Sequence, residues 1–297
     1  MQTLSQPAEI EGLTMSDKLH TPLLRYHGGK FRLAKWIVEH FPSHKCYVEP
    51  FGGAASVLLQ KERSHGEVYN DIDQDIFNLF KVLRCEEKAR KLIVLCELTP
   101  YSRDEFLFAY EETTDEIERA RRTIVRSAMG FGSGAATFHK TGFRCEAKRQ
   151  YNTSAHCWAK YPPVIEFVIQ RLKGVNIENR DALTCMLQHD GSETLHYIDP
   201  PYLMDTRNVR KGQSVYRYEM TNSEHESLLN HAKKLEGMVV ISGYESCLYN
   251  DYLHAWSKVK KDARISAGSG TKVKTECLWL SPSCVDALSS NGIKRAS

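Results

Sequence analysis

The sequence lacks the features that would mark a membrane protein, a disulfide framework or a zinc ribbon. No stretch approaches the roughly 20 consecutive apolar residues that a membrane-spanning helix needs, and residues 1–20 lack the apolar core of a signal peptide. The nine cysteines are scattered, without any Cys-x-x-Cys pair. Four possible metal ligands lie close together in the sequence, but their spacing fits no common zinc pattern: His139, Cys145, His156 and Cys157. We therefore expect reduced thiols, no metal, no membrane contact and a cytoplasmic location.

A strong overall charge, internal repeats and a dinucleotide fingerprint are missing as well. The formal net charge is only +3, so nucleic-acid binding has to be argued from local clusters of basic residues. No Gly-x-Gly-x-x-Gly sequence follows a predicted strand, which argues against a nicotinamide-dependent oxidoreductase. The 297 residues suffice for one large domain, or for a core that carries an insertion.

Short apolar strands alternate with helices in two stretches of the chain. The first has strands at 46–48 and 67–69, with helices at 31–41, at 54–60 and after Asp73, which is suited to cap the last of them. The second has strands at 175–177, 195–198, 238–241 and 273–280 and a helix at 223–235. This alternation predicts an α/β fold with a mostly parallel central sheet flanked by helices.

The part between the two stretches has a different composition. It is rich in glycine, basic and aromatic residues, with a helix predicted over 121–129 and a hairpin tip at Lys140–Phe143. We therefore expect a core made of 21–97 and 164–283, an inserted domain at 98–163, and flexible segments at 1–20 and 284–297.

The tetrapeptide Asp199-Pro200-Pro201-Tyr202 follows a predicted buried strand and is the most informative motif. The prolines end the strand, because neither can donate to a sheet. A carboxylate, a prolyl carbonyl and an aromatic ring then lie where open α/β sheets bind ligands. Together they suit a planar molecule with an exocyclic amino group. A plain proline turn with a capping Asp199 is the alternative.

Three further segments suit a nucleotide-like cofactor. Glycine and alanine in Glu49–Ser56 allow a ligand to approach the backbone after the first strand. Asp71 ends the second strand, where an acid accepts hydrogen bonds from ribose hydroxyls. The paired glycines of Arg25–Lys30 allow a tight turn. Taken singly, these segments also suit ordinary strand–helix packing, a helix cap and a loop.

The order of these motifs, over about residues 23–280, resembles the Dam-like, alpha-class DNA adenine-N6 methyltransferases. The resemblance implies a Rossmann-like methyltransferase fold with an inserted target-recognition domain, and S-adenosylmethionine as cofactor with S-adenosylhomocysteine as product. It implies methyl transfer to N6 of an adenine flipped out of DNA, without a covalent intermediate. The catalytic residues implied are Asp199, Pro200 and Tyr202, the last stacking on the base. The cofactor contacts implied are Tyr26, Lys30, Glu49, Phe51, Gly53, Asp71 and Asp199.

Basic and aromatic residues are interleaved in the insertion and again after the tetrapeptide, where 207–218 could close over the base. The residues expected to bind DNA are Arg126, Lys140, Arg144, Lys148, Arg149, Arg207, Arg210 and Lys211. A solvated basic surface is the alternative. The insertion lacks the Arg- and Asn-rich hairpin that reads GATC in the enzyme that gives the family its name, so GATC specificity does not transfer. Ala55 stands where the family usually has the last glycine of its first core motif; alanine is small, so we expect cofactor binding to be kept with a looser approach to the backbone.

The other expectations concern partners and rival activities. We expect a bacterial or phage-encoded, nucleoid-associated protein that is monomeric when free, with a cognate restriction enzyme as a candidate partner. The rivals are amino methylation of cytosine N4 or of RNA adenine, and a non-catalytic DNA-binding relative. Intact Asp199, Tyr202, Asp71 and Lys30 argue against the non-catalytic relative.

Overall fold

A central sheet organises the computed structural model, which describes residues 19–132, 140–145, 153–207, 216–267 and 270–295. Within these residues seven strands form one sheet in the order β3-β2-β1-β4-β5-β7-β6. The strands are β1 (Cys46–Glu49), β2 (Gly66–Asn70), β3 (Val175–Glu178), β4 (Thr194–Ile198), β5 (Met238–Gly243), β6 (Ser257–Ala267) and β7 (Gly270–Leu280). Strands β1 to β5 are parallel to one another, whereas β7 runs antiparallel to β5 and to β6. The expected mostly parallel α/β sheet is confirmed.

The central strands are buried on both faces. Every residue of β4 and β5 is buried, as is typical of parallel strands covered by helices on each side. Register pairs Glu49 with Tyr69 and Ile198 with Ile241, the last or nearly last residues of their strands. The segments that follow β1, β2, β4 and β5 therefore meet at one edge of the sheet.

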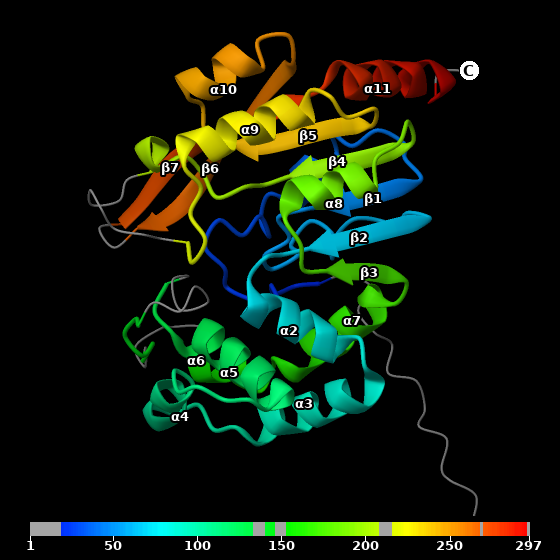
Figure 1. Cartoon of the computed structure of the whole chain (residues 1–297). Helices are drawn as coiled ribbons and strands as arrows, with labels where there is room; N and C mark the ends of the chain where they lie inside the picture. Colours follow the sequence, from blue (N-terminus) through cyan, green and yellow to red (C-terminus); the bar gives the residue numbers. More distant parts are fainter. Residues whose placement is uncertain (1–18, 133–139, 146–152, 208–215, 268–269, 296–297) are drawn as a thin grey trace, which may run out of the picture.

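Helices cover the sheet and extend beyond its β3 edge (Figure 1). Asp73 caps α2 as expected, because its side chain accepts a hydrogen bond of 2.8 Å from the Asp75 amide. Among the described residues, no helix has the length and apolar character to cross a membrane. The helices are α1 (Ala34–Val38), α2 (Gln74–Leu83), α3 (Glu86–Leu98), α4 (Arg103–Phe108), α5 (Glu116–Met129), α6 (Ser154–Ala159), α7 (Pro162–Leu172), α8 (Ala182–Gln188), the 3-10 turn η2 (Met204–Thr206), α9 (Asn222–Ala232), α10 (Cys247–Tyr252) and α11 (Pro282–Arg295).

The segment between β2 and β3 is helical. Helix α5 contacts α2, α3 and α4, and this group lies beyond the β3 edge, below the sheet in Figure 1. Gly130 forms an isolated antiparallel bridge with Phe143. Phe143 is therefore one partner of an antiparallel bridge, whereas the sequence had predicted a hairpin tip at Lys140–Phe143.

Three predicted elements differ in the structure. Residues 54–60, expected to be a helix, form consecutive turns, and Ala55 has a positive φ of 51° that interrupts helical geometry. Strand β6 was not predicted, because its lysines hide the apolar alternation. The expected flexible tail at 284–297 begins as helix α11: Ser281 Oγ accepts from the Cys284 amide, and Cys284 is buried in the core. The Ser281-Pro282 pair is a helix-start signal that the sequence analysis overlooked.

Candidate active site

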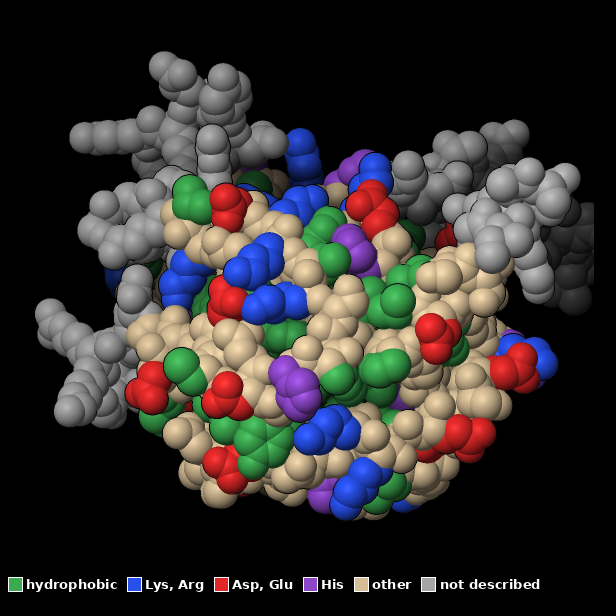
Figure 2. Space-filling view, turned by 90° about the horizontal axis from the view of Figure 1, so that it is seen from above, with side chains coloured by type: hydrophobic (Ala, Val, Ile, Leu, Met, Phe, Trp, Pro, Cys, Tyr) green, Lys and Arg blue, Asp and Glu red, His purple; other side chains and the backbone are tan. Residues whose placement is uncertain are grey.

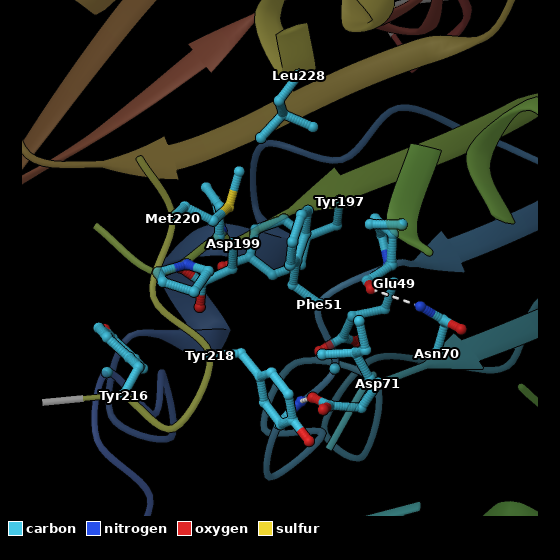
Figure 3. Close-up of a pocket in the computed structure, with 18 of the residues that line it drawn as sticks. Glu49, Phe51, Asn70, Asp71, Tyr197, Asp199, Tyr216, Tyr218, Met220 and Leu228 are labelled. Carbon is cyan, nitrogen blue, oxygen red and sulfur yellow. Dashed lines mark hydrogen bonds between the residues drawn. The ribbon is translucent and has the colours of Figure 1, made fainter. Parts of the chain in front are cut away.

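The edge of the sheet where the parallel strands end contains a cavity of about 330 Å³ (Figure 3). It is lined by the turn before α1, by the segments after β1 and β2, by Asp199–Pro201 after β4 and by residues 216–220 before α9. The residues after β3, Arg180–Leu183, complete it and were not predicted. Every residue expected to contact the cofactor lines this one cavity: Tyr26, Lys30, Glu49, Phe51, Gly53, Asp71 and Asp199.

Asp199 is held at the cavity by two side chains from other segments. Lys30 Nζ donates to both carboxylate oxygens at 2.8 Å, and also to the Gly28 carbonyl at 2.7 Å. Ser242 Oγ, on β5, donates to Asp199 Oδ1 at 2.8 Å. The side chain of Lys30 is only 5% exposed, so solvent screens its pairing with Asp199 weakly. The carboxylate keeps lone pairs for a further donor, since each of its oxygens can accept more than one hydrogen bond.

Tyr202 lies deeper than the sequence suggests. Its ring is 6% exposed, its hydroxyl contacts Glu276 on β7, and Lys30 Nζ lies 4.7 Å from the ring centroid. The Tyr244 ring meets it edge-on at 4.7 Å. Tyr202 is thus already packed against Lys30 and Tyr244 in this structure, and its stacking on a base stays a prediction.

The turn after β1 is bound tightly to the end of β2. Gly53 has a positive φ of 48°; its amide donates to Asp71 Oδ2 at 2.7 Å, and its carbonyl accepts from the Tyr69 hydroxyl at 2.6 Å. Asn70 Nδ2 donates to the Pro50 carbonyl at 2.9 Å. Asp71 Oδ1 also accepts from the Asp73 amide. These contacts fix Asp71 at the floor of the cavity (Figure 3).

Burial raises the pKa of two acids that line the cavity, Glu49 and Asp71. It raises the pKa of Glu49 to about 8, although Glu49 Oε2 accepts hydrogen bonds from the Tyr47 hydroxyl and the Leu58 amide. It raises the pKa of Asp71 to about 6, against the opposing effect of two amide donors. Removing a carboxylate from water costs free energy unless a cation or donors compensate, so the cavity favours a ligand that supplies them.

The buried Glu49 carboxyl predicts a pH dependence of stability. Its folded pKa exceeds its unfolded one, so the folded protein holds a proton that the unfolded chain releases, and the free energy of unfolding falls as pH rises from about 4.5 through about 8. Glu49→Gln removes this pH dependence. We expect the free energy of unfolding of the variant, relative to that of wild type, to rise by more than about 2 kcal/mol between pH 5 and pH 9. Denaturant unfolding of both proteins at the two pH values measures it. Parallel stabilities across that range would contradict the assignment.

Two residues expected to bind DNA have structural roles. Arg126 is 2% exposed; its guanidinium donates to the Ala109 carbonyl at 2.7 Å and pairs with Asp75 at 3.1 Å. Arg207 pairs with Glu219 at 2.6 Å and donates to the Tyr202 carbonyl, with its side chain 5% exposed. The DNA-binding prediction for both stays a prediction, but each guanidinium is already paired within the protein. The sequence did not indicate this, because a basic residue carries no sign of whether an acid is folded against it.

The other basic residues divide between the surface and undescribed parts of the chain. Lys140 is exposed and Arg144 is half-buried. Lys148, Arg149, Arg210 and Lys211 lie outside the described residues. Figure 2, which views the molecule from above, shows basic and acidic side chains interspersed rather than gathered into one basic field.

Replacing buried Arg126 or exposed Lys140 should therefore affect stability very differently. Arg126→Ala leaves a buried carboxylate with fewer partners, and we expect it to lower the free energy of unfolding by about 3 kcal/mol. Lys140→Ala should change it by less than about 0.5 kcal/mol, since the side chain is exposed. Thermal unfolding separates the two variants. A stable Arg126→Ala protein with weakened DNA binding would support the DNA-binding prediction.

One group of described residues has metal-ligand types within reach of one another. Ligand atoms of Glu178, Cys185 and His189 lie within 4.8 Å of each other. His189 Nε2 is 2.9 Å from Glu178 Oε1, and Arg180 Nε is 3.1 Å from Glu178 Oε2. Burial raises the pKa of the Cys185 thiol to about 12, which disfavours the thiolate that a metal requires. We interpret the group as a hydrogen-bonded link between β3 and α8.

The sequence analysis missed residues on late strands that complete the site. Glu276 and Ser242 contact the tetrapeptide from β7 and β5, and no local motif marked either one as functional. Asp181 lines the cavity and caps α8 by accepting from the Thr184 amide. Asp181 follows the end of β3 by three positions, so it lacked the direct strand–acid sequence that marked Asp71.

Comparison with known proteins agrees with the fold and the motifs. The profile of the D12 class N6 adenine-specific DNA methyltransferases matches residues 26–265. DNA adenine methylase of Salmonella typhi is 36% identical over 278 residues, covering 87% of this chain and 94% of the relative. DNA adenine methylase of Escherichia coli strain K12 is 26% identical over 281 residues, with the same coverage. The retron Ec67 DNA adenine methylase of Escherichia coli is 23% identical over 273 residues, covering 87% of this chain and 90% of the relative.

The match extends over both halves of the parallel sheet and the helices between them. The predicted resemblance and the predicted enzyme class are confirmed. The chain belongs to the D12 class of N6 adenine-specific DNA methyltransferases.

Proposed function

We propose that this protein binds S-adenosylmethionine in the cavity at the strand ends and methylates N6 of an adenine rotated out of duplex DNA. The observation that carries the proposal is the cavity itself, which joins the glycine turn, Asp71 and Asp199-Pro200 within one volume. When bound, S-adenosylmethionine supplies a methyl group on a positively charged sulfur. The remaining chemistry falls to side chains of this chain.

The cavity residues suit a nucleoside cofactor. Asp71 is at a strand end where ribose hydroxyls can donate to it, and Phe51, Ile72 and Leu183 offer apolar contacts for a purine ring. The glycine turn after β1 leaves little room for a side chain, since a Cβ on Gly53 would lie 3.1 Å from the Tyr26 ring. Tyr26, Glu49, Phe51, Gly53 and Asp71 are the residues we assign to the cofactor.

Adenine N6 is a weak nucleophile, because its lone pair is delocalised into the ring. The carboxylate of Asp199 and the carbonyl of Pro200 would accept hydrogen bonds from the two N6–H groups. Such acceptors favour a more pyramidal nitrogen, and the negative charge offsets the positive charge that develops on N6. Lys30 and Ser242 hold Asp199 in one orientation, so little reorganisation is needed as transfer proceeds.

The DNA contacts are also part of the proposal. We assign the inserted domain, 98–163, to target recognition, with exposed Lys140 and half-buried Arg144 as phosphate contacts among the described residues. Tyr216 and Tyr218 line the cavity, which supports a role for residues 216–220 beside the flipped base. The bacterial relatives, named DNA adenine methylases, support DNA as the substrate. The proposal further takes the free protein to be a monomer in the cytoplasm, acting on chromosomal or phage DNA, with a cognate restriction enzyme as a candidate partner.

One experiment tests this assignment as a whole. Purified protein is incubated with DNA of mixed sequence and S-adenosylmethionine, and the DNA is then digested to nucleosides and also sequenced for modified positions. We expect N6-methyladenine at a defined sequence, and none when the cofactor is omitted. N4-methylcytosine, or methylation of RNA only, would overturn the base or the substrate. Cofactor binding without methylation of any substrate would indicate a non-catalytic relative.

A further inference from the structure

A buried acid on β7 contacts the catalytic motif without a role in the chemistry described above. Glu276 is 4% exposed and lies on β7, the last strand in chain order, where it is paired in register with Lys261 of β6. Its carboxyl accepts the hydrogen bond of the Tyr202 hydroxyl. Its Oε1 atom also lies 4.0 Å from Lys30 Nζ. A buried carboxyl is costly unless specific partners compensate it, and here both partners belong to the site.

These contacts join four separate segments of the chain. Lys30 Nζ lies between two carboxyls, at 2.8 Å from Asp199 and 4.0 Å from Glu276, and above the Tyr202 ring at 4.7 Å. Tyr202 is connected in turn to β7 through its hydroxyl and to Tyr244 through its ring. The position of the Tyr202 ring therefore depends on β7, although the tetrapeptide itself follows β4.

We propose that Glu276 is a positioning residue for methyl transfer: it fixes the Tyr202 ring and holds Lys30 in place, and so orients Asp199 toward the N6 atom of the target adenine. The inference rests on the proposed role of Asp199 and on the stacking role that the family resemblance implies for Tyr202. Without the Glu276 carboxyl, the Tyr202 hydroxyl loses its buried partner and the ring gains freedom to rotate. Lys30 also loses the second carboxyl that restrains it.

Burial is consistent with this role. It raises the pKa of Glu276 to about 7, and Lys30 opposes that rise. A group poised between its charged and neutral forms can accept a hydrogen bond from the Tyr202 hydroxyl in either form. Its contribution is thus an oxygen acceptor at a fixed place, which glutamine also supplies.

Three variants of the pair separate positioning from a structural role. We expect Glu276→Ala to lower kcat by roughly tenfold to a hundredfold, as a small misplacement of reacting groups does. The affinity for S-adenosylmethionine, measured by calorimetry, should stay within about twofold, since Glu276 does not line the cavity. Glu276→Gln should recover most of the lost rate. Glu276→Ala added to Tyr202→Phe should cost less than it does alone, because the contact between the two side chains is then already lost.

The controls keep this inference distinguishable from the proposed function. Glu245→Ala is the matched control: this exposed glutamate pairs with Lys258 and Lys260 and should leave the rate unchanged. If wild type methylates adenine and Glu276→Ala does so equally well, the positioning role is wrong while the proposed function stands. Multiplicative losses in the double variant, or a glutamine variant as slow as the alanine one, would also overturn it. An inactive wild type that binds no cofactor would instead reject the proposed function.

Discussion

Replacing Asp199 by asparagine is expected to lower kcat at least about a thousandfold, as the loss of a preorganised charge at a reacting centre does. Asparagine has almost the same shape, but it is neutral, and its amide group would direct hydrogen atoms toward Lys30 or toward N6. The site would lose the negative charge that offsets the developing positive charge, and its one remaining acceptor oxygen could serve N6–H only by turning the amide NH2 toward the Lys30 cation. Single-turnover methylation of DNA, with protein in excess, measures the step directly.

Two comparisons make the Asp199 result interpretable. Asp205→Asn alters an exposed aspartate in the same segment and should leave the rate within about twofold, as surface changes usually do. Asp199→Ala should be as inactive as Asp199→Asn. Lys30 loses its carboxylate partner in both variants, so both also need a test of folding. Cofactor binding and thermal unfolding report whether each variant folds. A folded Asp199→Ala protein that turns over normally would remove Asp199 from the mechanism.

Gly52→Ala is expected to lower the free energy of unfolding by about 3 kcal/mol or more, because the turn after β1 has no room for a methyl group. A Cβ at Gly52 would lie 2.1 Å from Cε2 of Tyr69. That ring is fully buried, stacks on Phe80 with centroids 4.3 Å apart and bonds the Gly53 carbonyl through its hydroxyl. The ring cannot withdraw without breaking these contacts, so the turn that lines the cavity must move. Denaturant unfolding measures the loss of stability, and its repetition with S-adenosylmethionine measures whether the displaced turn weakens cofactor binding.

Gly66→Ala is the matched control for Gly52→Ala. Gly66 begins β2, and a Cβ there would meet only Cys46 Sγ at 3.8 Å, an ordinary contact. We expect a change below about 1 kcal/mol. Tyr69→Leu combined with Gly52→Ala should regain part of the stability, because the smaller side chain relieves the clash. If Gly52→Ala and Gly66→Ala unfold alike, the Tyr69 ring yields more easily than its packing suggests.

Features that depend on neighbouring residues were predictable. The strands that carry the site appear as short apolar runs, and Asp73 caps α2 as its position before an amphipathic pattern suggests. The cofactor residues converge because parallel strands end at a common edge, which the order of the motifs already implies. The prediction failed at residues 54–60, where the positive φ of Ala55 turns the chain away from a helix.

Features that depend on distant partners were not predictable. Arg126 and Arg207 look like phosphate contacts, and only folding brings Asp75 and Glu219 against them. Glu276 carries no motif of its own, yet the antiparallel turn of β7 into the sheet places it against Tyr202. Tyr202 itself looked like an open stacking surface and is buried.

The sequence by itself determined the α/β sheet, the glycine turn after β1 and the place of the tetrapeptide at a strand end, because those depend on residue type and local order. Only the tertiary structure decided how Asp199 is held, which arginines are buried, and that β7 supplies an acid to the site. The physical reason is that hydrogen bonds and ion pairs of buried polar groups must be satisfied by whatever lies nearby in space. Their partners here are between 12 and 169 positions away along the chain.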